Sequence, residues 1–218
     1  TTGAENVAVG AYALTANTTA GENTAIGQNS LLSNTTGSAN TSVGKSSLAS
    51  STTGANNTAV GKGALGANTT ADNNTAVGIT ALGANTTGTE NVAFGQVALT
   101  ANTTGDYNTA LGRAALYNNT TADNNTAVGW ITTGSSNIII GYVSDVSASG
   151  AASQFVLGNG VISAGNSNFT FGDGTSDSNI ANGATTITAP SDIRLKEDIQ
   201  DEEVGLDFIK DLRPVTFQ

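Results

Sequence analysis

The chain has no Cys, no His and no Met, and only two Pro and one Trp among its 218 residues. Without Cys there is no disulfide, and without Cys and His there is no ordinary zinc, haem or iron–sulfur site. The missing imidazole also excludes a Ser-His-Asp or Cys-His nucleophile. We therefore expect no cofactor, no metal and no conventional hydrolase in this chain.

Charge and long apolar runs are scarce as well. Only 11% of the residues are charged, and the net charge is −10, which disfavours a nucleic-acid partner because phosphates require Lys and Arg. No segment approaches the ~20 apolar residues of a membrane helix, so we expect no membrane insertion. The apolar residues are mostly Ala and Val, which disfavours a large globular core. The missing Met, and a start at Thr1 within a repeat, favour a fragment or processed product.

A repeat of 17 residues dominates what is present. Gly recurs at this interval from Gly10 to Gly129, and a Thr-Thr pair closes each of the first seven units. An Asn stands four residues before each of these Gly residues, at Asn6, Asn23, Asn40, Asn57, Asn74, Asn91, Asn108 and Asn125. A Leu stands four residues after each of the first seven, at Leu14, Leu31, Leu48, Leu65, Leu82, Leu99 and Leu116.

The segment Asn-Thr-Ala-Val-Gly is typical of a short strand between turn-forming residues. No run of helix formers is long enough for a helical repeat. We therefore predict an all-β fold, a β-solenoid or β-roll of 17-residue coils. Eight coils and a shortened ninth, ending at residue 141, form the first domain.

Stacked coils, ~4.8 Å apart, place equivalent residues in columns. We expect the Asn column to form an amide ladder and the turns to rely on Gly and Asn for positive φ. We expect the Leu column and the aliphatic column from Val9 to Val128 to fill the interior. The Ala residues between them are then expected to face outward, against other copies of the chain.

The regular sequence repeat ends after the ninth predicted strand. Residues 142–190 are predicted to form an irregular β stalk, with strands at 154–158, 168–172 and 185–188, and Trp130 is expected to cap the last coil. The composition changes at Ser191, because the last 28 residues carry 8 acidic and 4 basic side chains against 9 and 3 before them. A short helix is predicted over 201–212.

The segment from Ser191 to Ile199, with Gly205–Ile209 and Leu212–Phe217 after it, resembles the opening of the self-cleaving chaperone domain of phage tail fibres, the S74 peptidase family. The repeats are similar to those before this domain in phage fibres and, more loosely, to the β-roll heads of trimeric autotransporter adhesins. The resemblance implies a homotrimer and cleavage of the Pro190-Ser191 bond by Ser191, with Lys196 assisting. A partly desolvated Lys is a feasible base where His is missing. Residues 191–218 then form the truncated start of the chaperone.

The function expected from this resemblance is structural and adhesive. The chain forms the shaft of a virion tail fibre, in contact with other tail proteins and with a glycan or protein receptor on the host. It is not an enzyme beyond the single self-cleavage. The exposed contacts are expected directly after the repeat Gly, at Ala11-Tyr12, Gln28-Asn29, Lys45-Ser46, Lys62-Gly63 and Arg113-Ala114, although a solvated turn is favoured at any single one of these positions and no receptor-binding residue is identified.

Other functions are less favoured. A bacterial trimeric adhesin or secreted filament is the main alternative, which a signal peptide with a membrane anchor upstream of the chain would support. An ice-binding solenoid is less favoured, because the adjacent Thr-Thr residues point to opposite faces of a strand. The repeats hold too few acids for a glycosidase pair, and Asp173–Asp177 lacks the ligand spacing of a calcium loop.

Overall fold

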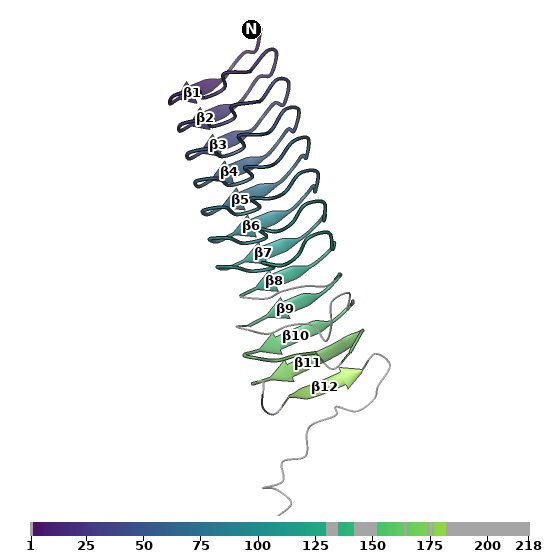
Figure 1. Ribbon diagram of the computed structural model, residues 1–218. Helices are drawn as coiled ribbons and strands as arrows, with labels where there is room; N and C mark the ends of the chain where they lie inside the picture. The colour runs from purple at the N-terminus through teal and green to yellow at the C-terminus, as the bar shows by residue number, and fades with distance from the viewer. Residues whose placement is uncertain are drawn as a thin grey trace, which may run out of the picture.

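The computed structural model describes residues 2–129, 135–141, 152–163, 165–173, 175 and 177–181. These residues form twelve short strands and no helix (Figure 1). The strands are β1 (Val7–Val9), β2 (Thr24–Ile26), β3 (Thr41–Val43), β4 (Thr58–Val60), β5 (Thr75–Val77), β6 (Val92–Phe94), β7 (Thr109–Leu111), β8 (Thr126–Val128), β9 (Ile138–Ile140), β10 (Phe155–Gly158), β11 (Asn168–Gly172) and β12 (Ser178–Ala181). Among the described residues, no helix is long and apolar enough to cross a membrane.

All twelve strands belong to one sheet, in sequence order, and β1 to β11 run parallel. Between β1 and β8, each strand residue pairs with the residue 17 positions later, in the next strand, as Thr58 does with Thr75. The step to β9 shortens to 12 residues, since Val128 pairs with Ile140. The predicted all-β solenoid of 17-residue coils is confirmed.

The sheet continues beyond residue 141. Two of the strands predicted there are present as β10 and β11, and both pair in parallel with the stack at steps of 17 and 14 residues. β12 then pairs antiparallel with β11 and is the last strand of the sheet. The strand expected at 185–188, the helix expected at 201–212 and Trp130 lie outside the described residues.

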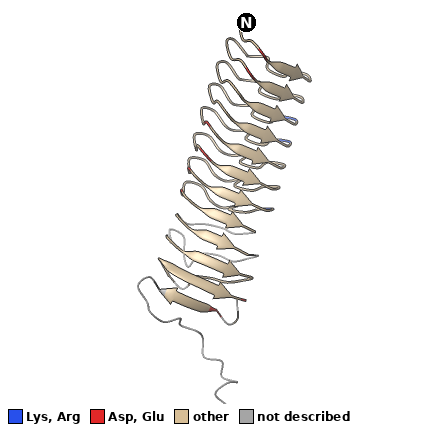
Figure 2. Cartoon of the chain, turned by 180° about the vertical axis from the view of Figure 1, so that it is seen from behind, with Lys and Arg blue, Asp and Glu red and all other residues tan. Residues whose placement is uncertain are grey.

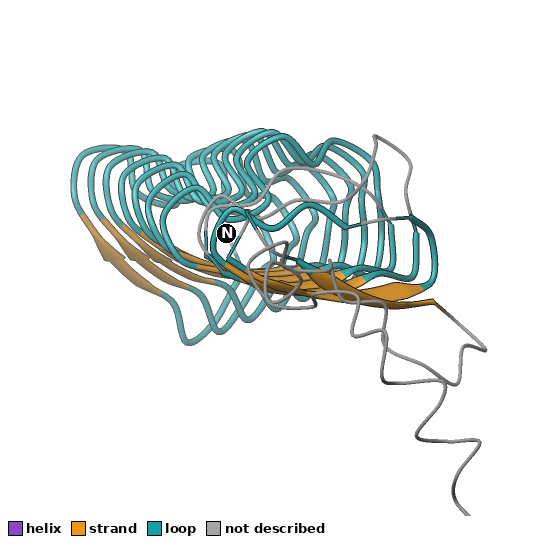
Figure 3. Ribbon diagram, turned by 90° about the horizontal axis from the view of Figure 1, so that it is seen from below, coloured by secondary structure: helices purple, strands orange, loops and turns teal. Residues whose placement is uncertain are grey.

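Each coil places its strand on one side and its turns on the other (Figure 3). The Leu side chains of the repeat fill the space between these two walls and are buried as predicted, from Leu31 to Leu116 at 2% exposure or less. The assignment of the strand faces was inverted. The Ala residues of β2 and β4 to β8 are buried at 0%, whereas the aliphatic column points outward, with Val9 56% and Phe94 53% exposed.

The inversion has a steric cause. In the 17-residue coils, the inward residue of each strand shares the interior with the Leu column and with small turn residues such as Ala64, Ala81 and Ala98, which are buried at 0%. In the third coil, where Ser replaces Ala, the Ser30 hydroxyl donates a hydrogen bond to the Ser42 hydroxyl at 2.7 Å, across the interior. A Val at such a position in these coils would overpack the interior, and larger residues, Ile139 and Val156, occupy the inward position only in β9 and β10, after the regular coils. The larger aliphatic residues therefore face outward.

The expectation that Gly and Asn supply positive φ is confirmed at the repeat Gly residues and at Asn29, Asn56, Asn73 and Asn124, but other residues share this conformation. The repeat Leu residues themselves have φ between 47° and 52°, a conformation that costs a bulky L-residue about 1–2 kcal/mol. Hydrogen bonds on both sides hold this geometry. Leu65 N–H donates to Ala81 O in the next coil at 3.0 Å, and Leu65 O accepts from Asn68 N–H at 3.1 Å.

Two Gly residues of the fourth coil make these constraints testable. Gly61 has φ +138°, and an added Cβ would overlap the carbonyl oxygen of Gly78. Gly63 has φ +66°, and its added Cβ would meet only Thr80 Cγ2 at 3.5 Å. We expect Gly61→Ala, which adds both strain and overlap with the next coil, to lower the free energy of unfolding by about 3 kcal/mol or more, and Gly63→Ala, which adds only the strain of positive φ, to lower it by about 1 kcal/mol. Thermal unfolding followed by circular dichroism measures both, and equal effects would contradict the stacking geometry.

Candidate functional site

The predicted Asn ladder is present along the whole repeat. From Asn23 to Asn125 the side chains are at most 1% exposed. Asn57 is typical of them. Its Oδ1 accepts the backbone N–H of Asn74 at 3.0 Å, and its Nδ2 donates to Asn40 Oδ1 at 3.2 Å and to Ala71 O at 2.9 Å. Each amide therefore joins its own coil to the coils before and after it.

The ladder continues after the eighth coil, where the interval between equivalent residues is no longer constant. Asn137 N–H donates to Asn125 Oδ1 at 3.1 Å across the shortened step. Gln154 N–H then donates to Asn137 Oδ1 at 3.0 Å. The hydrogen-bonded column thus connects the regular coils to β10.

A second amide ladder was not expected from the sequence. It runs along the residue three positions after the repeat Leu, for which no ladder was predicted. Asn102 Nδ2 donates to Asn85 Oδ1 at 2.9 Å, and Asn119 Nδ2 donates to Asn102 Oδ1 at 3.0 Å. The sequence does contain a pattern that indicates this ladder. Asn occupies the position in six of the first seven coils, as Asn17, Asn34, Asn68, Asn85, Asn102 and Asn119.

The third coil interrupts this second ladder. Ser51 takes the place of Asn and is fully buried. The Ser51 hydroxyl is too short to reach the neighbouring amide, and both Ser51 Oγ and Asn34 Oδ1 are buried without a hydrogen-bond partner. Such groups lower stability, because they lose water without gaining a protein partner.

The first Thr of each Thr-Thr pair forms a third column of contacts. Thr52 Oγ1, for example, donates to Thr69 O in the next coil at 3.1 Å, while Thr53 is exposed. The pair therefore serves mainly to join successive coils. This arrangement leaves no exposed double array of Thr side chains at the Thr-Thr positions.

The outward face of the sheet carries two parallel columns of side chains. One column is mostly Thr and the other is aliphatic or aromatic, and the strands β1 to β12 contain no charged residue. Towards β11 the face becomes aromatic. Phe155 and Phe169 meet edge to face with ring centroids 4.9 Å apart, Phe171 lies 5.1 Å from Phe169, and a hollow is lined by Phe155 and Phe169. The face is thus an uncharged, largely apolar strip along the stack.

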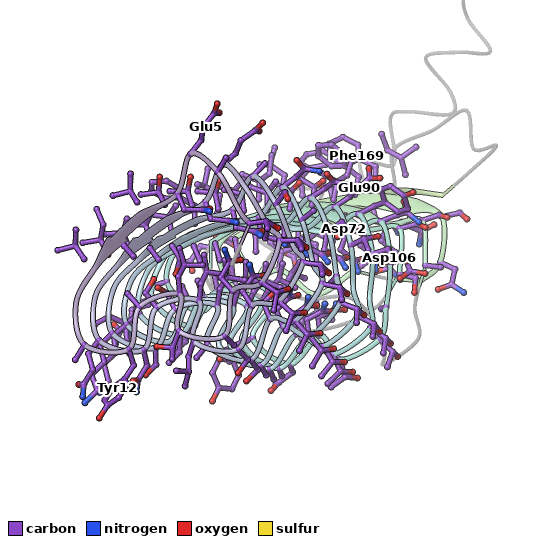
Figure 4. All side chains as sticks on the ribbon, turned by 90° about the horizontal axis from the view of Figure 1, so that it is seen from above. Glu5, Tyr12, Asp72, Glu90, Asp106 and Phe169 are labelled. Carbon is purple, nitrogen blue, oxygen red and sulfur yellow. The ribbon has the colours of Figure 1, made fainter. Side chains whose placement is uncertain are left out.

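The charged residues lie along the two edges of this strip (Figure 2). In the 17-residue coils, Lys and Arg follow the ends of the strands, and Asp and Glu precede their beginnings, whereas Asp173 follows the end of β11. Figure 4 shows Asp72, Glu90 and Asp106 at one end of the coils and Tyr12 at the other. Asp72 also has a structural role, because its Oδ1 accepts the Ala55 backbone N–H at 2.7 Å.

The turns proposed as receptor contacts are mostly accessible. Tyr12, Gln28, Lys45, Lys62 and Arg113 are exposed, whereas Ala114 is buried. Tyr107 and Tyr117 are exposed at 54% and 42%. These side chains come from separate coils and do not line a common pocket in the described part of the chain.

The structure offers little support for chemistry within the repeats. Among the described residues, no group of three His, Cys, Asp or Glu side chains is placed to hold a metal ion. Asp173 Oδ1 accepts hydrogen bonds from Thr175 N–H at 2.9 Å and Thr175 Oγ1 at 2.7 Å, which is a local turn. Ser191 and Lys196, the residues predicted to perform self-cleavage, lie outside the described residues.

Comparison with known proteins identifies the last segment only. Residues 191–218 match the family model described as the chaperone of endosialidase, Peptidase S74. This is the segment whose resemblance to that family was found in the sequence. No curated protein matches the chain. No solved structure matches it either.

The interrupted second ladder can be repaired by one substitution. In Ser51→Asn, the new Nδ2 would donate to the unpartnered Asn34 Oδ1, and the new Oδ1 would accept from Asn68 Nδ2. We expect the free energy of unfolding to rise by about 1 kcal/mol, measured by thermal or denaturant unfolding.

The matched control makes the reverse substitution at another position of the same ladder. Asn85→Ser removes an amide that accepts from Asn102 and donates to Asn68 Oδ1 and Gly88 O, and should destabilise the chain by about 1–3 kcal/mol. If Ser51→Asn lowered stability as Asn85→Ser does, the second ladder would not stabilise the stack.

Proposed function

We propose that this chain is the structural and adhesive shaft of a phage tail fibre, assembled as a homotrimer with the help of a self-cleaving C-terminal chaperone. The observation that carries the proposal is the order of parts along the chain. A stack of β coils leads into a segment that matches the chaperone-of-endosialidase family. Such a stack supplies length and stiffness without a catalytic pocket, which suits a shaft better than an enzyme.

The exposed sheet face supports association of several copies. Eleven parallel strands at ~4.8 Å form a strip about 50 Å long and about 10 Å wide. Two such strips bring together roughly 1,000 Å² of flat area, the lower limit for a specific interface. Val9, Phe94 and Leu111 are about half exposed on this strip, and a contiguous apolar patch of this kind marks an interaction site.

The remaining exposed surface is available for contact with the host. In a trimer whose sheet faces meet, the turn side of each coil stays outside. Tyr117, which directly follows Leu116 and is 42% exposed, then presents a ring that stacks on sugars or on a protein receptor. The fibre would be part of the virion, joined to other tail proteins. The alternative is a bacterial surface adhesin or secreted filament with the same architecture.

An ice-binding role depends on a bare sheet face. Thr residues occupy the first column of β2 to β5, β7 and β8, a regular array of the kind that such a role needs. Phe94 and Phe155 break the flatness of that array, and the second column is aliphatic. Association through this face would remove the surface that ice would contact.

The mass of the native particle tests the trimer. For the protein that carries its whole chaperone domain, we expect three times the mass of the chain observed on a denaturing gel, because the apolar strip is then covered by other copies. Light scattering or native mass spectrometry measures it. A monomer would contradict the fibre proposal. It would instead favour an ice-binding role for the exposed Thr column.

The same protein tests the chaperone. We expect Ser191→Ala to abolish cleavage of Pro190-Ser191 and to leave one uncut band on a denaturing gel, because the attacking hydroxyl is removed. Lys196→Ala should slow cleavage strongly, since the proposed base is lost. Lys210→Ala is the matched control and should be processed like the wild type. Normal processing of Ser191→Ala would eliminate the Ser-Lys assignment.

A further inference from the structure

The two edges of the sheet carry opposite charge. The basic residues before Ser191 are Lys45, Lys62 and Arg113, and each directly follows the Gly that ends a strand. They lie beside the ends of β3, β4 and β7, and all three are exposed. The acids of the repeat occupy the two positions before the ladder Asn, beside the strand beginnings. These acids are Glu5, Glu22, Asp72, Glu90, Asp106 and Asp123.

The separation of the charges holds along the 17-residue coils. Figure 2 shows the basic residues of these coils beside the arrowheads of the strands and the acidic ones beside the opposite ends. A strand of three residues with its flanking residues spans about 20 Å. Within one copy, the acids and bases of a coil are therefore too far apart to form ion pairs across the face.

The direction in which copies lie decides which edges meet. When copies with parallel axes pack their sheet faces around a common axis, the end edge of each sheet lies beside the beginning edge of the next. When two copies run antiparallel, like edges meet and equal charges face each other. The charge distribution therefore favours the parallel arrangement and opposes the antiparallel one.

We propose that copies of this chain associate with their axes parallel and their coils level, so that the basic edge of each copy lies against the acidic edge of the next. This inference rests on the proposed function for the identity of the partner, a second copy of the chain. It adds the direction, the register and the residues that select them. Exposed ion pairs contribute little affinity, but they suppress wrong orientations.

The positions of the charged residues along the stack agree with an arrangement in which equivalent coils of neighbouring copies lie side by side. Arg113, at the end of β7, would lie level with Asp106 of the neighbouring copy, at the beginning of β7. Lys45, at the end of β3, would lie one coil from Glu22 of the neighbour, and Lys62, at the end of β4, one coil from Asp72. One coil is ~4.8 Å, a step that a Lys side chain covers. Every base of the repeat thus has an acid at its own level or one coil away.

Zero-length cross-linking tests the arrangement on the native protein with its whole chaperone domain. Isotope-labelled and unlabelled chains are co-assembled, treated with a carbodiimide, which joins amines to carboxylates in contact, and analysed by mass spectrometry. We expect links between copies that join Lys45 to Glu22 and Lys62 to Asp72. A separate amine-to-amine reagent reports the antiparallel arrangement, through links between Lys45 and Lys62 of different copies.

Charge removal provides a second measurement with a matched control. Lys45→Gln, Lys62→Gln and Arg113→Gln together should raise the apparent dissociation constant of the assembly about tenfold at low salt, and salt should reduce the difference. The control makes the same change of net charge on the turns after the Leu column, with Thr15→Glu, Ser50→Glu and Asn118→Glu, and should leave the constant unchanged.

The outcomes separate this inference from the proposed function. A monomeric particle would refute the proposed function itself. A trimer that gives Lys-to-Lys links between copies, or no Lys-to-acid links, would overturn the edge pairing and leave the trimer intact. Equal weakening by the two triple variants would attribute the effect to net charge and would also overturn it.

Discussion

Hydrogen bonding between successive coils is the constraint on which the rest of this structure depends. Val7 N–H donates to Asn23 O at 2.8 Å, and Gly27 N–H donates to Val9 O at 2.7 Å, and equivalent bonds recur along the stack. These bonds form only when each coil repeats the backbone path of the coil before it. The Gly after each strand has φ of 115–139° from Gly10 to Gly129, and all of these Gly residues except Gly112 lie so close to the next coil that an added side chain would overlap its backbone. Identical residues recur because the same backbone conformation recurs.

The same constraint explains why the interior is half polar. A coil of 17 residues closes around a space that holds one Leu and a few methyl groups, which is a thin core by the standard of a globular domain. The amide ladders contribute hydrogen bonds inside coils that have no room for further large apolar side chains. Asn91, for example, joins Asn74, Asn108 and the Gly105 carbonyl. Stability is therefore spread over neighbouring coils, and no central core exists in the described residues whose loss would unfold everything at once.

Features that depend on the period alone could be predicted from the sequence, whereas features that depend on steric fit could not. The interval of 17 residues was sufficient for parallel strands, for the Leu column and for the first amide ladder, because a stack places equal positions together. Alternation showed that Thr58 and Val60 share a face opposite Ala59, but the rule that larger apolar residues face inward chose the wrong face. The space inside the 17-residue coils, which Leu and the small turn residues already fill, is a tertiary property that no local pattern contains. Positive φ at Leu65 was equally invisible, because one of the two bonds that stabilise it is made to Ala81 in the next coil. Ser191 and Lys196 were found only by family resemblance, which the geometry of the described residues does not test.

The outward face imposes a condition on whatever covers it. Its apolar column repeats at the strand spacing over eleven strands, and the face changes from Thr with Ile26 or Val at β2 to β5 into Ile at β9 and Phe and Leu at β10 and β11. A partner that covers it fully needs a complementary surface with the same spacing and the same gradient. A second copy of the chain meets that condition without any additional coincidence, provided that the copies are level and parallel. A shift of one coil leaves one rung bare at each end, and a reversal places the aromatic end against the Thr-rich end. The repeat that builds the single stack thus also selects the simplest partner for it.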